Sequence, residues 1–126
     1  MIIEDKGEFS FDPVTKADYE AERVMRLLIE AERPCDSILG EEIEQKIGSS
    51  DYQWVLDPID GTRAFVAGIP VWGVLVALNF ETKPVLGIIN QPYTGEVFVG
   101  GLGTSEFFRD GFATEMRSKN TERLED

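Results

Sequence analysis

The pattern of apolar and polar positions predicts one amphipathic helix followed by a series of short strands. Between Thr15 and Pro34, apolar side chains recur at helical spacing, at Ala17, Ala21, Val24, Leu27, Leu28 and Ala31. Thr15 is a good N-cap, Asp18 stands three residues later as in a capping box, and Pro34 ends the pattern. We therefore expect a long amphipathic helix that lies on a sheet, with Glu22 and Arg26 as a supporting i,i+4 pair.

Short apolar runs after Pro34 predict strands joined by turns that contain glycine or proline. The expected strands cover residues 37–39, 52–56, 71–80, 85–90, 96–99 and 107–108. Their close spacing is typical of an antiparallel meander rather than of βαβ units. The predicted fold class is therefore α+β, an antiparallel sheet with a long amphipathic helix packed on it.

The two ends of the chain carry weaker patterns. Residues 1–14 are expected to be irregular, because Gly7, Asp12 and Pro13 interrupt any periodicity. Residues 114–126 are charged and almost without apolar side chains. We interpret this polar tail as a loop that stops in mid-course.

The composition narrows the partners and the chemistry. A length of 126 residues suits one domain, and 24 acids against 12 bases give a net charge of −12, which disfavours nucleic acid and anionic membranes. Histidine is absent, which excludes Ser-His and Cys-His dyads and imidazole zinc sites within this chain. The single cysteine, Cys35, excludes an internal disulfide and is interpreted as a structural thiol. With no signal-peptide pattern and no membrane-spanning run, we expect a cytoplasmic protein.

The candidate chemistry lies in residues 57–62, Asp-Pro-Ile-Asp-Gly-Thr. Asp57 and Asp60 follow a short apolar run and are expected at a turn where a strand ends. Gly61 and Thr62 can open a short helix with free backbone N–H groups. Because carboxylates bind hard cations and helix N-termini bind phosphate, the motif offers both halves of a metal-assisted phosphate site. All-oxygen ligands select magnesium, manganese or calcium over zinc. A bound divalent cation also makes the local charge positive, so that a phosphate ester is no longer repelled.

Each acidic position also has a simpler structural explanation. Asp-Pro and Asp-Gly are common turn dipeptides, Asp60 could cap a helix, the pair Glu41-Glu42 could be solvated, and Asp18 could be a cap only. Their combination is more specific, because three separate acidic positions each begin a helix or lie near the end of an expected strand, where sites gather. Haloacid dehalogenase-type phosphatases carry Asp-x-Asp-Gly-Thr after a strand, but here two residues separate the aspartates and the strands look antiparallel.

Three motifs resemble, in order and spacing, the inositol monophosphatase family. They are residues 14–18 (Val-Thr-Lys-Ala-Asp), 40–42 (Gly-Glu-Glu) and 54–62 (Trp-Val-Leu-Asp-Pro-Ile-Asp-Gly-Thr), of which the last is highly specific. The continuation over 63–73 looks most like the histidinol-phosphate phosphatase branch. The resemblance covers residues 6–125. It implies that residues 1–126 are a single incomplete domain, the N-terminal half of an αβαβα fold, truncated at both ends.

The resemblance also implies a set of metal ligands. Glu41, Asp57 and the backbone carbonyl of Ile59 would hold a first magnesium ion, and Glu41 counts among the catalytic residues as well. Asp57 would bridge to a second ion, which is also held by Asp60 and by an aspartate of the missing half. Two or three Mg²⁺ ions are implied, and Mn²⁺ could replace them.

Further roles concern the water and the phosphate. By resemblance, Thr62 paired with Asp18 would orient the attacking water. The N–H groups of Gly61 and Thr62, together with Asp60, would bind the phosphate, and Glu42 would support the metal shell. Two ions that clamp the ester and acidify water require no covalent enzyme intermediate.

The resemblance therefore predicts a Mg²⁺-dependent phosphomonoesterase that acts on a small-molecule phosphate ester. Histidinol phosphate, an intermediate of histidine biosynthesis, is the first choice of substrate. The alternatives are inositol 1-phosphate or another sugar phosphate, and a truncated cation-binding module without activity. No nucleic acid or membrane partner is expected, and a homodimer is an option for the complete protein because family members often dimerise. The isolated chain is expected to be poorly active.

Overall fold

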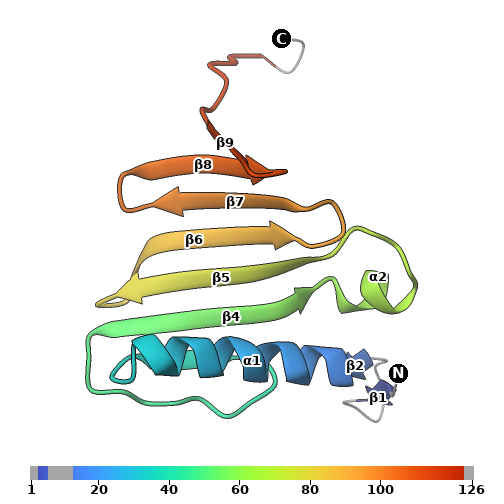
Figure 1. The fold of residues 1–126 in the computed structure, drawn as a ribbon, viewed down its shortest axis with the longest axis vertical. Helices are drawn as coiled ribbons and strands as arrows, with labels where there is room; N and C mark the ends of the chain where they lie inside the picture. Colours follow the sequence, from blue (N-terminus) through green and yellow to red (C-terminus); the bar gives the residue numbers. More distant parts are fainter. Residues whose placement is uncertain (1–2, 6–12, 124–126) are drawn as a thin grey trace.

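The structure, a computed structural model, describes residues 3–5 and 13–123. Figure 1 shows its main feature, a row of strands with the helix α1 (Lys16–Glu32) along one end and the C-terminal segment at the other. The helix bounds agree with the prediction, since α1 starts directly after Thr15 and ends before Pro34. Within the described residues, no helix combines the length and the apolar character needed to cross a membrane.

The seven strands of the main sheet lie side by side in sequence order. They are β3 (Ser37–Gly40), β4 (Tyr52–Asp60), β5 (Gly73–Phe80), β6 (Lys83–Gln91), β7 (Glu96–Gly101), β8 (Thr104–Arg109) and β9 (Phe112–Glu115). From β4 onwards each strand pairs with the next in the antiparallel sense, as predicted. However, β3 and β4 are parallel, so the sheet is mixed. The polar segment 41–51 makes this possible, because it carries the chain back to the edge of the sheet where β3 begins, so that β4 starts beside the first residues of β3.

Two-residue turns join several of the antiparallel strands. Both central residues have positive φ in the turns at Glu81-Thr82 (46° and 71°), Leu102-Gly103 (52° and 78°) and Asp110-Gly111 (50° and 79°). This pattern is typical of type I′ turns, whose twist matches that of the flanking strands. The last turn creates the β8–β9 hairpin, so the strand expected at 107–108 is longer than predicted. Thr114 and Glu115, which were expected in the polar tail, belong to β9.

Two short stretches near the N-terminus form strands that the sequence did not predict. Strand β1 (Ile3–Asp5) pairs in the antiparallel sense with β2 (Pro13–Thr15), and the register places Ile3 opposite Thr15. The prediction of an irregular segment over 1–14 is therefore wrong for these strands. The expected breakers Gly7 and Asp12 lie outside the described residues.

The helix α1 turns a polar face toward the sheet. Its most buried side chains are Asp18 (3% exposed), Glu22 (0%) and Arg26 (8%), whereas Leu27 and Leu28 are 55% and 67% exposed. We expected the amphipathic helix to pack on the sheet, and α1 does pack against β4. However, α1 does not bury its apolar stripe. Its inward side chains, Glu22 and Arg26, meet backbone groups after β3 that need hydrogen-bonding partners.

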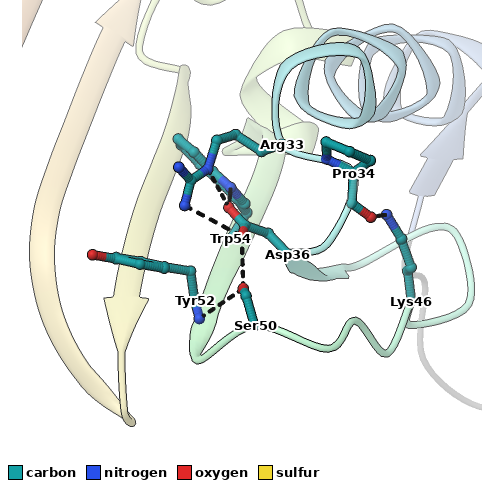
Figure 2. A network of polar contacts seen from close by, with 7 residues as sticks. All are labelled: Arg33, Pro34, Asp36, Lys46, Ser50, Tyr52 and Trp54. Atoms are coloured by element: carbon teal, nitrogen blue, oxygen red, sulfur yellow. Dashed lines mark hydrogen bonds and ion pairs between the residues drawn. The ribbon is translucent and has the colours of Figure 1, made fainter.

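A buried carboxylate ties the end of α1 to the start of β4 (Figure 2). Asp36 is 2% exposed and accepts hydrogen bonds from Arg33 Nε (2.8 Å), Ser50 Oγ (2.6 Å) and Trp54 Nε1 (3.0 Å). Ser50 Oγ in turn accepts the N–H of Tyr52 at 3.1 Å. Burial raises the pKa of Asp36, but the three hydrogen bonds and the charge of Arg33 outweigh it and hold the pKa below its ordinary value.

Asp36→Asn tests the strength of this tie. The amide replaces one acceptor oxygen with a donor and removes the ion pair, so we expect a loss of about 1–3 kcal/mol in the free energy of unfolding at pH 7. Because the folded-state pKa of Asp36 is lowered, its stabilisation is present above the ordinary pKa and is lost as pH falls through the folded-state value. Urea unfolding should therefore show a gap between wild type and variant that narrows in acid. Equal stability at pH 7 would contradict this account.

Candidate active site

The last residues of β4 form a β-bulge, not the turn that the sequence predicts. Asp57 pairs with Leu75 and Asp60 pairs with Gly73, so three steps along β4 match two along β5. One residue is therefore extra in β4, in the stretch that contains Pro58, which has no N–H to donate. The strand continues to Asp60 rather than ending at residue 56.

The bulge decides where the two aspartates point. In a regular strand, residues three apart face opposite sides of the sheet. Leu75 and Gly73 are two apart and share a side, so their partners Asp57 and Asp60 share a side as well. The charge of Asp60 acts on Asp57 and raises its pKa, which agrees with this placement. Bulges often re-aim side chains beside active sites.

Asp57 is the centre of an acidic cluster. Burial, followed by the charges of Glu41, Asp60 and Asp18, raises the pKa of Asp57 to about 6. These groups come from three parts of the fold: α1 supplies Asp18, the segment after β3 supplies Glu41, and β4 supplies both Asp57 and Asp60. The structure therefore brings four predicted site residues into one electrostatic neighbourhood.

One oxygen of this cluster lacks a partner. Asp57 Oδ1 is buried and, among the described residues, has no hydrogen-bond donor. A buried carboxylate oxygen in this state is costly, and a hard cation is a group that would satisfy it. In residues 3–5 and 13–123, however, no three carboxylates are close enough together to hold one metal ion. The donor chemistry thus fits a hard cation, but the described residues do not form a closed coordination shell.

The segment after the bulge begins the short helix α2 (Thr62–Val66), as predicted. Gly61 precedes it with φ 84° and ψ 42°, a left-handed conformation that favours glycine, and a Cβ there would lie 3.1 Å from the carbonyl oxygen of Val71. The Thr62 hydroxyl donates to the carbonyl oxygen of Ile59 at 3.1 Å. This bond gives the predicted metal-binding carbonyl a partner, and the pairing of Thr62 with Asp18 stays a prediction.

Sequence reasoning missed the residues that hold the acidic segment after β3. Glu22 accepts the backbone N–H groups of Glu42 (2.9 Å) and Ile43 (2.8 Å), and Arg26 donates to the Ile43 carbonyl at 3.0 Å. From the sequence, Glu22 and Arg26 were interpreted only as an i,i+4 pair that supports the helix. Its alignment with Asp18, at i, i+4 and i+8 on one helix face, is the signal that could have revealed it.

An open apolar concavity adjoins the cluster. Its volume is about 850 Å³, and its lining runs across the sheet from β3 to β7 and includes both Glu41 and Asp57. This volume is in the range of small-molecule sites. Asp57 therefore stands at the edge of an apolar surface, whereas its neighbours Glu41 and Asp60 are exposed to solvent.

Comparison with solved structures defines the class of fold. The extragenic suppressor protein suhB from Bartonella henselae matches with a TM-score of 0.83 and 34% sequence identity, over 98% of this chain and 46% of that chain. The seven-stranded mixed sheet with its two helices thus has the fold of about half of that α+β protein.

Sequence comparison gives the family. Residues 1–125 match the inositol monophosphatase family, and the chain belongs to it. The histidinol-phosphatase of Chlorobaculum parvum is 42% identical over 95 residues, which are 75% of this chain and 37% of that protein. The chloroplastic bifunctional phosphatase IMPL2 of Arabidopsis thaliana is 48% identical over 103 residues, 80% of this chain and 29% of that protein. The chain spans less than half the length of these relatives.

Asp57→Asn should stabilise the metal-free chain at neutral pH. The pKa of Asp57 in the folded chain, about 6, lies above the ordinary 3.8, so ionisation disfavours the fold and stability falls as pH rises from about 4 to about 6. We expect a gain of about 1 kcal/mol at pH 8 in EDTA, a figure reduced for the partial exposure of Asp57. Urea unfolding at pH 8 and at pH 3.5 measures it. A variant less stable than wild type at pH 8 would refute the unfavourable charge at Asp57.

Proposed function

We propose that this chain carries the magnesium-binding part of a phosphomonoesterase that hydrolyses a small phosphate ester. The buried Asp57 Oδ1, which has no donor in the described part of the chain, is the observation that carries the proposal. Glu41, Asp60 and Asp18 surround it with negative charge. Membership of the inositol monophosphatase family and the phosphatase names of the relatives support the same class of reaction.

Each residue has a role in this proposal. Asp57 and Glu41 hold the cation with the carbonyl oxygen of Ile59, which has a second lone pair beside the one that Thr62 occupies. Asp60, on the same side of the strand as Asp57, extends the ligand set. Bound Mg²⁺ supplies positive charge for the ester and lowers the pKa of water.

The phosphate and the water are handled by the residues around the bulge. The backbone N–H groups of Gly61 and Thr62 lie at the start of α2 and donate to the phosphate. Asp18, only 3% exposed, and Thr62 orient the attacking water, and Glu42 supports the ligand shell. With a net charge of −12, the chain repels a phosphate ester unless cations are bound, so metal and substrate binding are coupled.

Histidinol phosphate is the proposed substrate. The support is the histidinol-phosphatase of Chlorobaculum parvum, which is 42% identical over the shared segment, together with the motif continuation over residues 63–73. Inositol 1-phosphate or another sugar phosphate is the alternative substrate, because the family as a whole is named for inositol monophosphate.

A second candidate function is a cation-binding module without turnover. The observation in its favour is that, in the part of the chain that the structure describes, no three carboxylates enclose a common metal position. The chain also covers only 37% and 29% of two relatives. Further ligands from the rest of such a protein would complete the shell.

Magnesium titration followed by a phosphate-release assay separates these candidates. We expect calorimetry on the 126-residue chain to show Mg²⁺ binding that Asp57→Asn abolishes, because the carboxylate at the centre of the acidic cluster is lost. Slow, Mg²⁺-dependent release of phosphate, faster from histidinol phosphate than from inositol 1-phosphate, supports the esterase. Binding without any release supports the cation-binding module, and the absence of binding rules out both.

Thr62→Ala separates metal binding from catalysis. The substitution removes the hydroxyl that orients water and leaves the carboxylates in place, so Mg²⁺ affinity should change by less than about threefold. Phosphate release should fall about 10²–10⁴-fold, as for loss of a group that assists proton transfer. Thr62→Ser, which keeps the hydroxyl, is the matched control and should retain most of the activity. Equal rates for the alanine variant and wild type would remove Thr62 from the mechanism.

A further inference from the structure

The fully buried carboxylate of Glu22 is hydrogen-bonded to the backbone of Glu42 and Ile43, directly after the predicted metal ligand Glu41. We propose that the Glu22–Arg26 pair is a positioning device that fixes this segment so that Glu41 faces Asp57. The inference rests on the proposed function, because it concerns the placement of a metal ligand. Nothing in it requires Glu22 or Arg26 to touch the metal.

Glu22 uses both carboxylate oxygens. Oε1 accepts the N–H of Glu42 at 2.9 Å, and Oε2 accepts the N–H of Ile43 at 2.8 Å and Arg26 Nε at 3.1 Å. The side chain is 0% exposed. Charge-assisted bonds to two successive backbone N–H groups fix the orientation of the peptide plane between them, which a single bond could not do. The backbone is therefore held from a rigid helix immediately after Glu41.

Arg26 completes the arrangement. Its guanidinium, 8% exposed, pairs with Glu22 and also donates to the Ile43 carbonyl oxygen at 3.0 Å. Ile43 thus has its N–H held by Glu22 and its C=O held by Arg26. Because a buried carboxylate without a cationic partner is costly, the pairing with Arg26 lowers the cost of burying Glu22 at this place.

Gly40 makes the close approach possible. A Cβ at this position would collide with the Glu22 carboxylate. The residue before the acidic pair is therefore glycine for a packing reason, since the carboxylate lies against its Cα. The Gly-Glu-Glu motif and Glu22 form one unit, although 18 residues separate Gly40 from Glu22.

The same helix face also carries Asp18, one turn before Glu22. Residues i, i+4 and i+8 share a face, so Asp18, Glu22 and Arg26 form one buried stripe of α1. Asp18 acts on Asp57 through its charge, whereas Glu22 acts on the neighbours of Glu41 through their backbone. One rigid helix thereby sets the distance between the water-orienting residue and a metal ligand.

Glu22→Gln is the direct test, and Asp36→Asn is its matched control. Asp36 is almost as deeply buried and accepts hydrogen bonds from three side chains, but it ties the far end of α1. The glutamine keeps the shape but offers one acceptor oxygen for two backbone donors. Calorimetry on the full 126-residue chain should show Mg²⁺ affinity reduced about 10–100-fold for Glu22→Gln, the range found for residues that support metal ligands. Asp36→Asn should lower stability and leave Mg²⁺ affinity within about twofold of wild type.

Amide hydrogen exchange gives a readout that does not depend on metal. The N–H groups of Glu42 and Ile43 should exchange faster in metal-free Glu22→Gln, relative to global unfolding, and should be unchanged in Asp36→Asn. If Glu22→Gln does not fold, Arg26→Lys replaces it, because lysine keeps the charge but cannot reach both Glu22 and Ile43 through a fork. Reduced Mg²⁺ affinity in a folded Arg26→Lys variant likewise supports the proposal.

The possible failures are distinct. Wild-type Mg²⁺ affinity in a folded Glu22→Gln or Arg26→Lys variant overturns the positioning role and leaves the proposed function standing. An equal loss of Mg²⁺ affinity in Asp36→Asn also overturns it, because the effect would then follow from general loosening of α1. If the wild-type chain itself binds no Mg²⁺, the proposed function fails and the positioning role fails with it.

Discussion

The placement of Asp57 is the constraint on which the rest of the site depends. Its carboxylate lies partly buried among like charges, and its Oδ1 has no donor from the described residues. A fold optimised for stability alone would replace such a group or give it a donor, because unpartnered buried oxygens and crowded carboxylates both cost free energy. The surrounding structure over-determines this position instead: a bulge aims Asp57, and α1 and the segment after β3 supply the acids that face it.

Two ion pairs with buried carboxylates, one at the middle of α1 and one just after its end, organise this arrangement. Asp36 ties the end of the helix to Trp54 on β4, while Glu22 ties its middle to the backbone after β3. The inward face of the helix is therefore polar. Hydrogen bonds hold the helix to the strands as much as apolar packing does. The acidic cluster around Asp57 is therefore positioned by Glu22 and Asp36, which are not members of the cluster.

The sequence predicted what local signals determine. The bounds of α1 were predicted from the positions of Thr15 and Pro34, and the order of strands from apolar runs and turns. The parallel β3–β4 pair was missed because residues 41–51 carry no signal for a crossover. The length of β4 was missed because proline is unusual inside a strand, so Pro58 was interpreted as part of a turn. Only the pairing with β5 shows that a bulge accommodates Pro58 within the strand. Among the site residues, Asp57 and the three acids around it were predicted. Glu22 was not, since i,i+4 pairs are usually exposed. Asp110-Gly111 was a readable hairpin signal that was overlooked.

The account makes one claim above all, that the acidic cluster at the end of β4 exists to receive a divalent cation. The most direct measurement is the pKa of the Asp57 carboxyl group. Carbon-detected NMR of the 126-residue chain measures it in a pH titration, with and without saturating Mg²⁺. The account predicts a pKa of about 6 without metal and a value well below the ordinary 3.8 with it, because the cation stabilises the ionised form. A titration curve of Asp57 that does not move when Mg²⁺ is added would contradict the claim.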